Sequence, residues 1–120
     1  MDFKIDTKEK FTVFTPNTAL FPANITEEMR LCLQKEVTNV VLNLKNVTSI
    51  SESDAENLGQ IHRQFYDNNS SFVICEAGTE VEKQFEEADI LDYLNITPTE
   101  SEAWDIVQME EVERDLLGED

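Results

Sequence analysis

Apolar residues recur along the chain at the two spacings that distinguish strands from helices. Near the start, two short segments alternate apolar and polar residues on either side of the sequence TKEK, a pattern that predicts a β-hairpin. Two later runs, 40–44 and 72–75, are apolar at nearly every position, as in strands that are buried on both faces of a sheet. A shorter segment at 93–96 predicts a last strand that stops before Pro98. The proline-bounded segment 16–22 predicts a loop or a short edge strand.

Four segments carry apolar side chains on one face at helical spacing, and each starts with a residue pair typical of a capping box. The four pairs are Asn24 with Glu27, Ser51 with Asp54, Thr79 with Glu82, and Thr99 with Glu102. The apolar face of the second helix consists of Ala55, Leu58, Ile61 and Phe65. We expect His62 in or beside this face, and the pair Asn68-Asn69 after the helix favours the left-handed conformation that ends helices.

The expected order of elements is ββαβαβαβα, without an internal repeat or linker. After the first hairpin, strands alternate with helices, which is typical of an α/β fold in which helical crossovers join parallel strands. We therefore expect a single α/β domain over residues 1–120, with a mixed, mostly parallel sheet of about four to five strands and about four helices. A chain of 120 residues is long enough for such a core and too short for two domains.

The last stretch, 108–120, combines an apolar repeat with many acids in the sequence QMEEVERDLLGED. Met109, Val112 and Leu116 keep helical spacing, while acidic residues fill most of the other positions. Two interpretations follow from this pattern. Either the last helix is long and its acidic end packs on its own domain, or the apolar stripe is the contact surface for a partner. The sequence pattern favours the first interpretation, in which the acidic end of the helix packs on its own domain.

Acidic residues far outnumber basic ones, 26 against 9, and give a net charge of −17 at neutral pH. This charge repels nucleic acid phosphates and anionic lipid surfaces, so we expect neither a nucleic acid nor a membrane partner. It attracts basic protein surfaces, although it also serves solubility alone. No apolar run approaches the roughly 20 residues of a membrane span, and the first residues lack the apolar core of a signal peptide. We therefore expect a cytoplasmic protein.

The residues needed for catalysis, metal binding or phosphate binding are scarce. His62 is the only histidine, and it lies ten residues from Glu52, about 15 Å along a helix, too far for a catalytic pair. The three glycines form no phosphate-binding loop. Cys32 and Cys75 lie in apolar patterns, which indicates buried free thiols. We expect no enzyme activity, no metal site and no cofactor.

The sequence VVLNLKNVTSISESDAENL, residues 40–58, resembles the central segment of STAS domains, the anti-sigma-factor antagonists and their relatives. In that family, a strand of the type V-hydrophobic-L-D/N-L is followed by V-x-x-hydrophobic-D-S-S/T-G and an apolar helix. The resemblance covers nearly the whole chain and implies the STAS fold. The family motif D-S-S/T-G corresponds here to residues 51–54, Ser-Glu-Ser-Asp, so Glu52 falls on the serine that family kinases phosphorylate.

The candidate partner-binding site is the polar elbow where the central strand turns into its helix, at the carboxyl end of the strand. Its predicted residues are Ser49, Ser51, Glu52, Ser53 and Asp54. A helix N-terminus favours an anion, and a carboxylate at Glu52 supplies one negative charge without a hydroxyl group to modify. Glu52 and Asp54 also suit the first turn of any helix, and capping is the role expected of Ser51. Asp54 replaces the family's glycine, which indicates an altered partner surface.

The resemblance implies a non-catalytic, protein-binding regulator similar to an anti-sigma-factor antagonist in a partner-switching pathway. There, the unmodified antagonist captures an anti-sigma factor, usually a serine kinase-like ATPase, and phosphorylation ends the capture. Glu52 at the phosphoserine position predicts a lost or altered phospho-switch. Two alternatives stay open. The chain is a constitutive STAS-like scaffold in a protein assembly, or it binds a small ligand or nucleotide at the same elbow.

Overall fold

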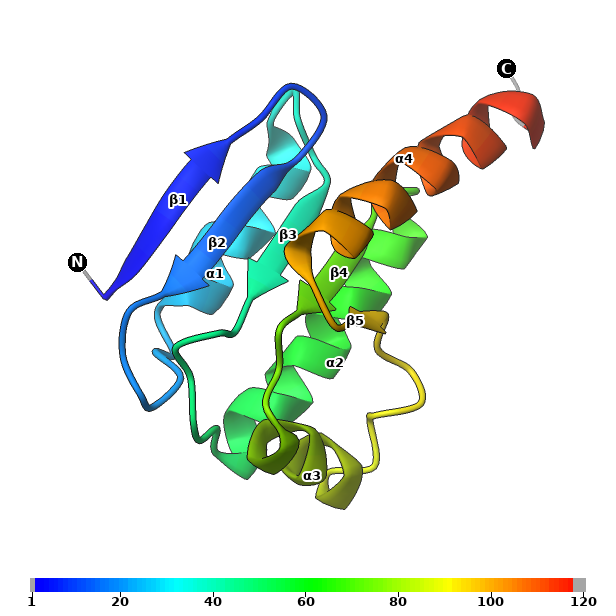
Figure 1. The fold of residues 1–120 in the computed structure, drawn as a ribbon. Coiled ribbons are helices and arrows are strands. Elements are labelled where there is room, and N and C mark those ends of the chain that lie inside the picture. Colours follow the sequence, from blue (N-terminus) through cyan, green and yellow to red (C-terminus); the bar gives the residue numbers. More distant parts are fainter. Residues whose placement is uncertain (1, 118–120) are drawn as a thin grey trace.

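The strands form one five-stranded mixed sheet. The computed structural model describes residues 2–117. The strands are β1 (Phe3–Thr7), β2 (Thr12–Pro16), β3 (Val40–Asn43), β4 (Phe72–Cys75) and β5 (Ile96–Thr97), and they are arranged in that order across the sheet (Figure 1). β1 and β2 pair antiparallel, which confirms the predicted hairpin, and the other neighbours pair parallel.

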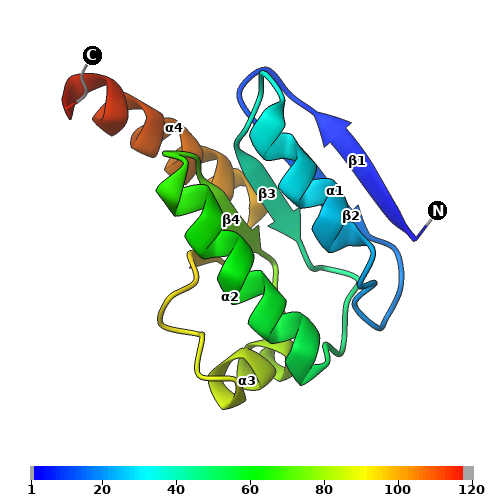
Figure 2. The same cartoon turned by 180° about the vertical axis from the view of Figure 1, so that it is seen from behind.

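Helices cover both faces of the sheet. They are α1 (Ile25–Leu31), α2 (Glu52–Asp67), α3 (Thr79–Glu87) and α4 (Glu100–Leu117), and a short 3-10 turn (Cys32–Gln34) follows α1. Helices α1 and α2 cover one face, α4 crosses the other, and α3 lies beyond the carboxyl ends of the parallel strands (Figures 1 and 2). The predicted order of elements and the α/β class are confirmed.

Strand β3 lies between two apolar cores, one on each face of the sheet. Val40 and Leu42 pack in the core under α1 and α2, whereas Val41 packs on the other side with Ala103 and Val107 of α4. All apolar residues of the run 40–44 are fully buried. The nearly continuous apolar pattern therefore identified a strand that is covered on both faces, because successive side chains of a strand point to opposite sides.

Two of the four predicted helix caps are confirmed. The Ser51 hydroxyl oxygen accepts a hydrogen bond from the Asp54 backbone N–H at 3.1 Å. At the start of α4, the Thr99 hydroxyl accepts from the Glu102 N–H at 3.2 Å and donates to its carboxylate at 2.9 Å. The predicted stop of α2 is also confirmed, because Asn69 has a positive φ of 57°.

The other two predicted caps are wrong, and the backbone conformation explains both. Asn24 already has helical angles, because a turn at Pro22 brings the Ile25 N–H to the Pro22 carbonyl, and its side chain caps nothing. Helix α3 begins at Thr79, as predicted, but Gly78 rather than Thr79 occupies its cap position, in an extended conformation. A capping side chain requires an extended backbone at its own residue, which neither Asn24 nor Thr79 has.

Two expectations near the end of the chain need correction. The segment predicted as a strand from residue 93 onward begins only at Ile96, because the N–H groups of Tyr93 and Leu94 bond back to the Ile90 carbonyl in a turn. Helix α4 is long, as predicted, but its apolar repeat at Met109, Val112 and Leu116 is exposed rather than packed on the domain. The rest of the predicted acidic stretch, 118–120, lies outside the described residues.

Candidate functional site

The elbow between β3 and α2 lies at the carboxyl end of the parallel strands (Figure 1). The structure brings together the five residues predicted from the sequence. Ser51, Glu52 and Ser53 are exposed, whereas Ser49 and Asp54 are half-buried. Because Ser51 caps α2 and Glu52 is the first helical residue, the Glu52 carboxylate lies at the positive end of the helix dipole. The elbow therefore presents an exposed negative side chain at the start of α2.

Helix α3 holds the elbow in place through one side chain that the sequence did not single out. The Ile50 backbone N–H donates a hydrogen bond to the Gln84 side-chain oxygen at 2.8 Å. Ile50 itself is buried, so this N–H has its partner in Gln84 rather than in solvent. No periodic pattern could identify Gln84, because the contact joins residues 34 positions apart in the chain.

The loop between β2 and α1 runs beside the elbow and adds an apolar side chain to it. Leu20 pairs with Ser49 in a short parallel bridge, and the Phe21 N–H donates to the Ser49 carbonyl at 3.0 Å. The Leu20 side chain stays 61% exposed. The segment is thus a loop, one of the two predicted alternatives, and it places an unburied leucine next to the polar residues of the elbow. Sequence reasoning did not assign Leu20 to the site.

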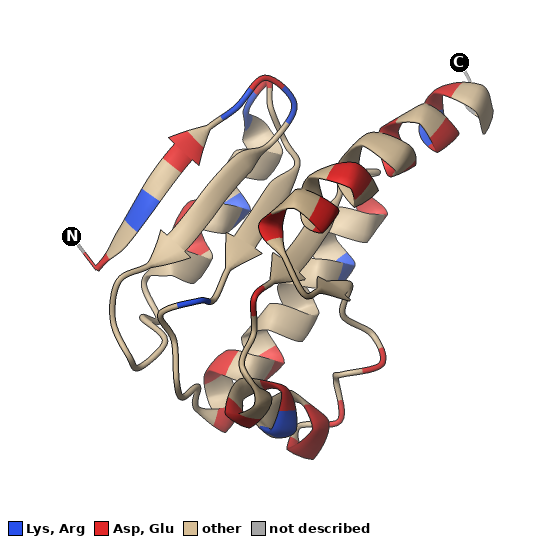
Figure 3. Ribbon diagram, viewed as in Figure 1, with Lys and Arg blue, Asp and Glu red and all other residues tan. Residues whose placement is uncertain are grey.

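A small cavity of about 280 Å³ opens between the elbow and α3, lined by Ile50, Glu52, Gln84, Glu87 and Ala88. Its charged lining residues, Glu52 and Glu87, are both acidic. Acidic residues also gather on α3 and the start of α2 around this end of the molecule (Figure 3). Such a lining repels phosphate groups, because two carboxylates face the space and no basic side chain balances them. The lining of this cavity therefore disfavours a nucleotide at the elbow.

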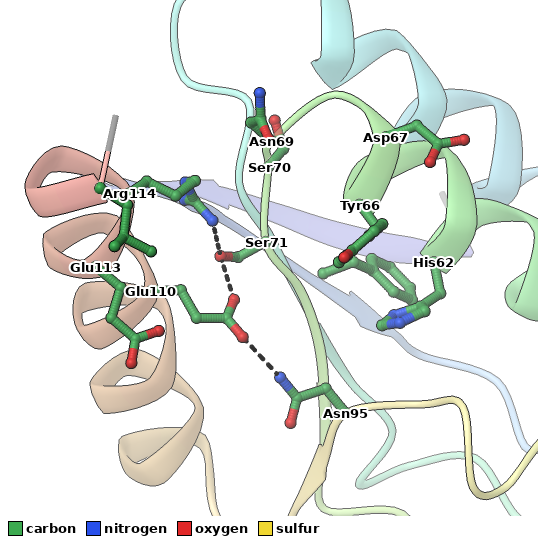
Figure 4. A pocket seen from close by; sticks show the side chains of 12 residues that line it. His62, Tyr66, Asp67, Asn69, Ser70, Ser71, Asn95, Glu110, Glu113 and Arg114 are labelled. Carbon is green, nitrogen blue, oxygen red and sulfur yellow. Dashed lines mark hydrogen bonds between the residues drawn. The ribbon is translucent and has the colours of Figure 1, made fainter. Parts of the chain in front are cut away.

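A larger pocket of about 610 Å³ lies at the opposite end of the sheet, between the C-terminal parts of α2 and α4 (Figure 4). Its polar wall is held by a hydrogen-bond network. The Ser71 hydroxyl donates to the Glu110 carboxylate and accepts from Arg114 at 3.3 Å, and Asn95 donates to Glu110 at 3.3 Å. The network fixes α4 against the start of β4. No sequence pattern indicated this pocket, because its residues come from three separate segments of the chain.

His62 lines this pocket and is half-buried. It follows Glu52 by ten positions along α2. Burial lowers the pKa of His62, while the Glu110 carboxylate and the Phe72 backbone act in the opposite direction. Its Nδ1 atom is buried and has no hydrogen-bond partner within residues 2–117. The imidazole is therefore neutral at neutral pH, and it is not arranged with the elbow residues as a catalytic pair.

The two cysteines are buried free thiols, as predicted. Burial raises the pKa of Cys75 to about 12, with the Glu100 and Glu76 carboxylates adding to the shift. Burial also raises the pKa of Cys32. Neither thiol forms a reactive thiolate at neutral pH.

Residues 2–117 contain no cluster of three or more His, Cys, Asp or Glu side chains that could hold a metal ion. Within the same span, no helix has the length and apolarity needed to cross a membrane.

Comparison with known proteins gives one consistent family and fold. A family model described as STAS domain matches residues 2–103. The NMR structure of the Thermotoga maritima protein TM1081 superposes with a TM-score of 0.75 at 20% identity and covers 88% of each chain. The unphosphorylated anti-sigma factor antagonist SpoIIAA gives a TM-score of 0.69 at 16% identity, over 88% of this chain and 96% of that one.

The same fold occurs inside a much larger protein. The murine anion transporter Slc26a9 in its inward-facing state matches with a TM-score of 0.68 at 9% identity, over 87% of this chain but only 18% of the transporter. Sequence comparison with curated proteins finds no significant match. At these identities the structural matches establish the fold, and the chemistry of the site has to come from this chain's own residues.

Proposed function

The chain belongs to the STAS domain family, and on this premise we propose that it is a non-catalytic, protein-binding regulator similar to an anti-sigma-factor antagonist in a partner-switching pathway. Its partner in this proposal is an anti-sigma factor of the serine kinase-like ATPase type. The pathway operates in the cytoplasm, where we infer that the chain acts. The likeness to SpoIIAA supports this choice among the contexts in which the fold occurs.

One observation carries the proposal: the elbow is rigid in its backbone and exposed in its side chains. The Ser51 cap and the Gln84 hydrogen bond fix the backbone, while Ser51, Glu52 and Ser53 point to solvent next to the exposed Leu20. A pre-organised surface of this kind binds a protein with little loss of conformational entropy. The exposed apolar side chain of Leu20 beside hydroxyl groups suits a partner surface with an apolar centre and a polar rim.

We further infer that the phospho-switch is lost or altered. The resemblance puts Glu52 where family kinases phosphorylate serine, and Glu52 has no hydroxyl group to accept phosphate. A carboxylate carries about one negative charge, whereas a phosphate carries about 1.5 to 2. The Glu52 side chain at the N-terminus of α2 therefore imitates part of the electrostatic effect of phosphorylation permanently.

The scaffold hypothesis is the second candidate, and it is supported by the occurrence of the same fold as one part of an anion transporter. In this case the elbow binds one partner constitutively within an assembly, and no kinase takes part. The third possibility, a nucleotide at the elbow, is disfavoured by the two carboxylates that line the adjacent cavity.

Affinity purification of the full chain from its native host, followed by mass spectrometry, tests the proposal. We expect the Glu52→Ser chain to recover an ATPase-type anti-sigma factor, and the native chain to recover less of it, because Glu52 imitates part of the effect of phosphorylation. Ser53→Lys added to Glu52→Ser should abolish this recovery, because the long charged side chain obstructs close contact at the elbow. Ser101→Lys is the matched control, since Ser101 is the second residue of α4 as Ser53 is of α2 and is equally exposed. Recovery of a stable assembly without a kinase would favour the scaffold instead.

A further inference from the structure

Helix α4 carries an apolar stripe that its own domain does not cover. Met109, Val112 and Leu116 are 60%, 57% and 80% exposed. They lie at spacings of three and four residues, so they share one side of the helix, which we call the outer stripe. Isolated exposed apolar residues are common on protein surfaces, but a row of three along one helix is a contiguous patch.

The opposite side of α4 is anchored, so the helix cannot turn the outer stripe inward. Ala103 and Val107 are buried against the sheet. Further along, the Glu111 carboxylate accepts a hydrogen bond from the Asn39 side chain at 2.8 Å, and Arg114 donates to Ser71 at 3.3 Å. Figure 1 shows the C-terminal part of α4 extending past the end of the sheet. The outer stripe is therefore a fixed feature of the surface.

The charges around the outer stripe are all negative. Asp105, Glu113 and Asp115 are three or four residues from members of the stripe, and none of them forms an ion pair within residues 2–117. Arg114 is the only basic residue of α4, and its guanidinium points to the sheet, where it contacts Ser71 and Asn39. The outward side of the helix thus combines apolar side chains with unpaired carboxylates.

We propose that the outer stripe is a second docking surface, and that its occupant is a basic amphipathic helix of a partner protein. The apolar side of such a helix covers Met109, Val112 and Leu116, while its lysines and arginines reach the flanking carboxylates. A second copy of this chain is the wrong occupant, because each copy carries a net charge of −17. An anionic membrane is wrong as well, because helices that lie on membranes have basic polar faces.

This surface is independent of the elbow. The family model ends at Ala103, so the outer stripe lies beyond the matched residues. The elbow lies at the carboxyl ends of the strands, whereas the exposed end of α4 extends past their opposite ends (Figure 1). Both surfaces can therefore hold partners at the same time, and either one can fail as a binding site without the other.

The test uses two synthetic peptides of lysine and leucine, about 18 residues long, which is about five helical turns. One peptide has its leucines at helical spacing, and the other has the same composition in scrambled order. We expect the amphipathic peptide to bind the full chain at least about tenfold more tightly than the scrambled one in calorimetric titrations. In NMR spectra of the labelled protein, the largest shifts should fall on residues 105–116.

Substitutions decide whether the outer stripe is the contact. Val112→Gln with Leu116→Gln keeps the charge and does not lower helix propensity, and should weaken amphipathic-peptide binding at least about tenfold. Leu31→Gln, an equivalent change at an exposed leucine of α1, and Glu52→Ser at the elbow should not weaken it. Equal affinity for both peptides, or shifts centred on acidic α3, would reduce the effect to charge attraction and overturn the proposal. A dimer, or binding to anionic vesicles, that the double variant abolishes would overturn it as well.

Discussion

The side-chain oxygen of Gln84 accepts a hydrogen bond from the backbone N–H of Ile50 at 2.8 Å and so joins helix α3 to the elbow. A buried N–H that loses its only partner costs about 1–3 kcal/mol. This single contact therefore links the stability of the domain to the shape of its candidate binding surface.

Gln84→Met should lower the free energy of unfolding by about 1–3 kcal/mol, because it removes the acceptor and keeps the side chain's size. Urea unfolding measures the loss, and hydrogen exchange at the Ile50 amide locates it. Gln84→Glu is the control, since it retains an oxygen that accepts the bond. Similar losses in both variants would show that the hydrogen bond is not the cause.

Glu52→Ser should tighten binding to the anti-sigma kinase at least about tenfold, roughly 1.4 kcal/mol, because it removes the charge that imitates phosphorylation. The helix should lose at most about 1 kcal/mol, since serine is acceptable in a first turn. Titration calorimetry measures the affinity, and circular dichroism confirms equal folding. Glu52→Gln separates the loss of charge from the gain of a hydroxyl. Weaker binding by Glu52→Ser would instead identify Glu52 as a contact residue.

Incubation with the anti-sigma kinase and ATP should leave the native chain without phosphate, because Glu52 offers no hydroxyl group. Glu52→Ser should accept about one phosphate per chain under the same conditions. Mass spectrometry of the intact protein gives the stoichiometry. Stoichiometric phosphate on Ser51 or Ser53 of the native chain would show that the switch has moved to a neighbour.

His62 should make the native chain lose stability at mildly acidic pH relative to His62→Gln. Burial lowers the folded-state pKa of His62 below its ordinary value. As the pH falls through about 6.5, the unfolded chain binds a proton at this residue before the folded chain does, which favours unfolding. Urea unfolding of both proteins from pH 8 to pH 5 gives the difference between their free energies of unfolding. The titration of the carboxylates is common to both proteins and cancels in this difference. A difference that does not change with pH would contradict this role.

Cys75 should react with thiol reagents only after unfolding, because its folded-state pKa is raised to about 12 and its side chain is buried. Iodoacetamide at pH 8 should leave both thiols free in the native chain and modify both in urea. The same shift predicts that stability decreases as the pH rises above about 8.5, where only the unfolded chain ionises its thiol. Cys75→Ala should reduce this decrease.

Local patterns were sufficient to determine the order of elements. The apolar run 40–44 predicted a strand covered on both faces, and the structure places it between two cores. The caps at Ser51 and Thr99 were also predictable, because the backbone of such a residue and its partner three positions later form one short unit. The same signal was wrong at Asn24, where the turn at Pro22 had already set helical angles.

The tertiary structure alone decided which distant residues complete the sites. Gln84 and Leu20 reach the elbow from segments that share no periodicity with it, and only the packing of α3 and the β2–α1 loop brings them there. The sequence showed the apolar repeat of α4 but favoured packing it on the domain. The helix can bury only one side against the sheet, and Ala103, Val107 and Arg114 occupy that side. Periodicity fixes which residues share a face, whereas long-range packing fixes which face meets solvent.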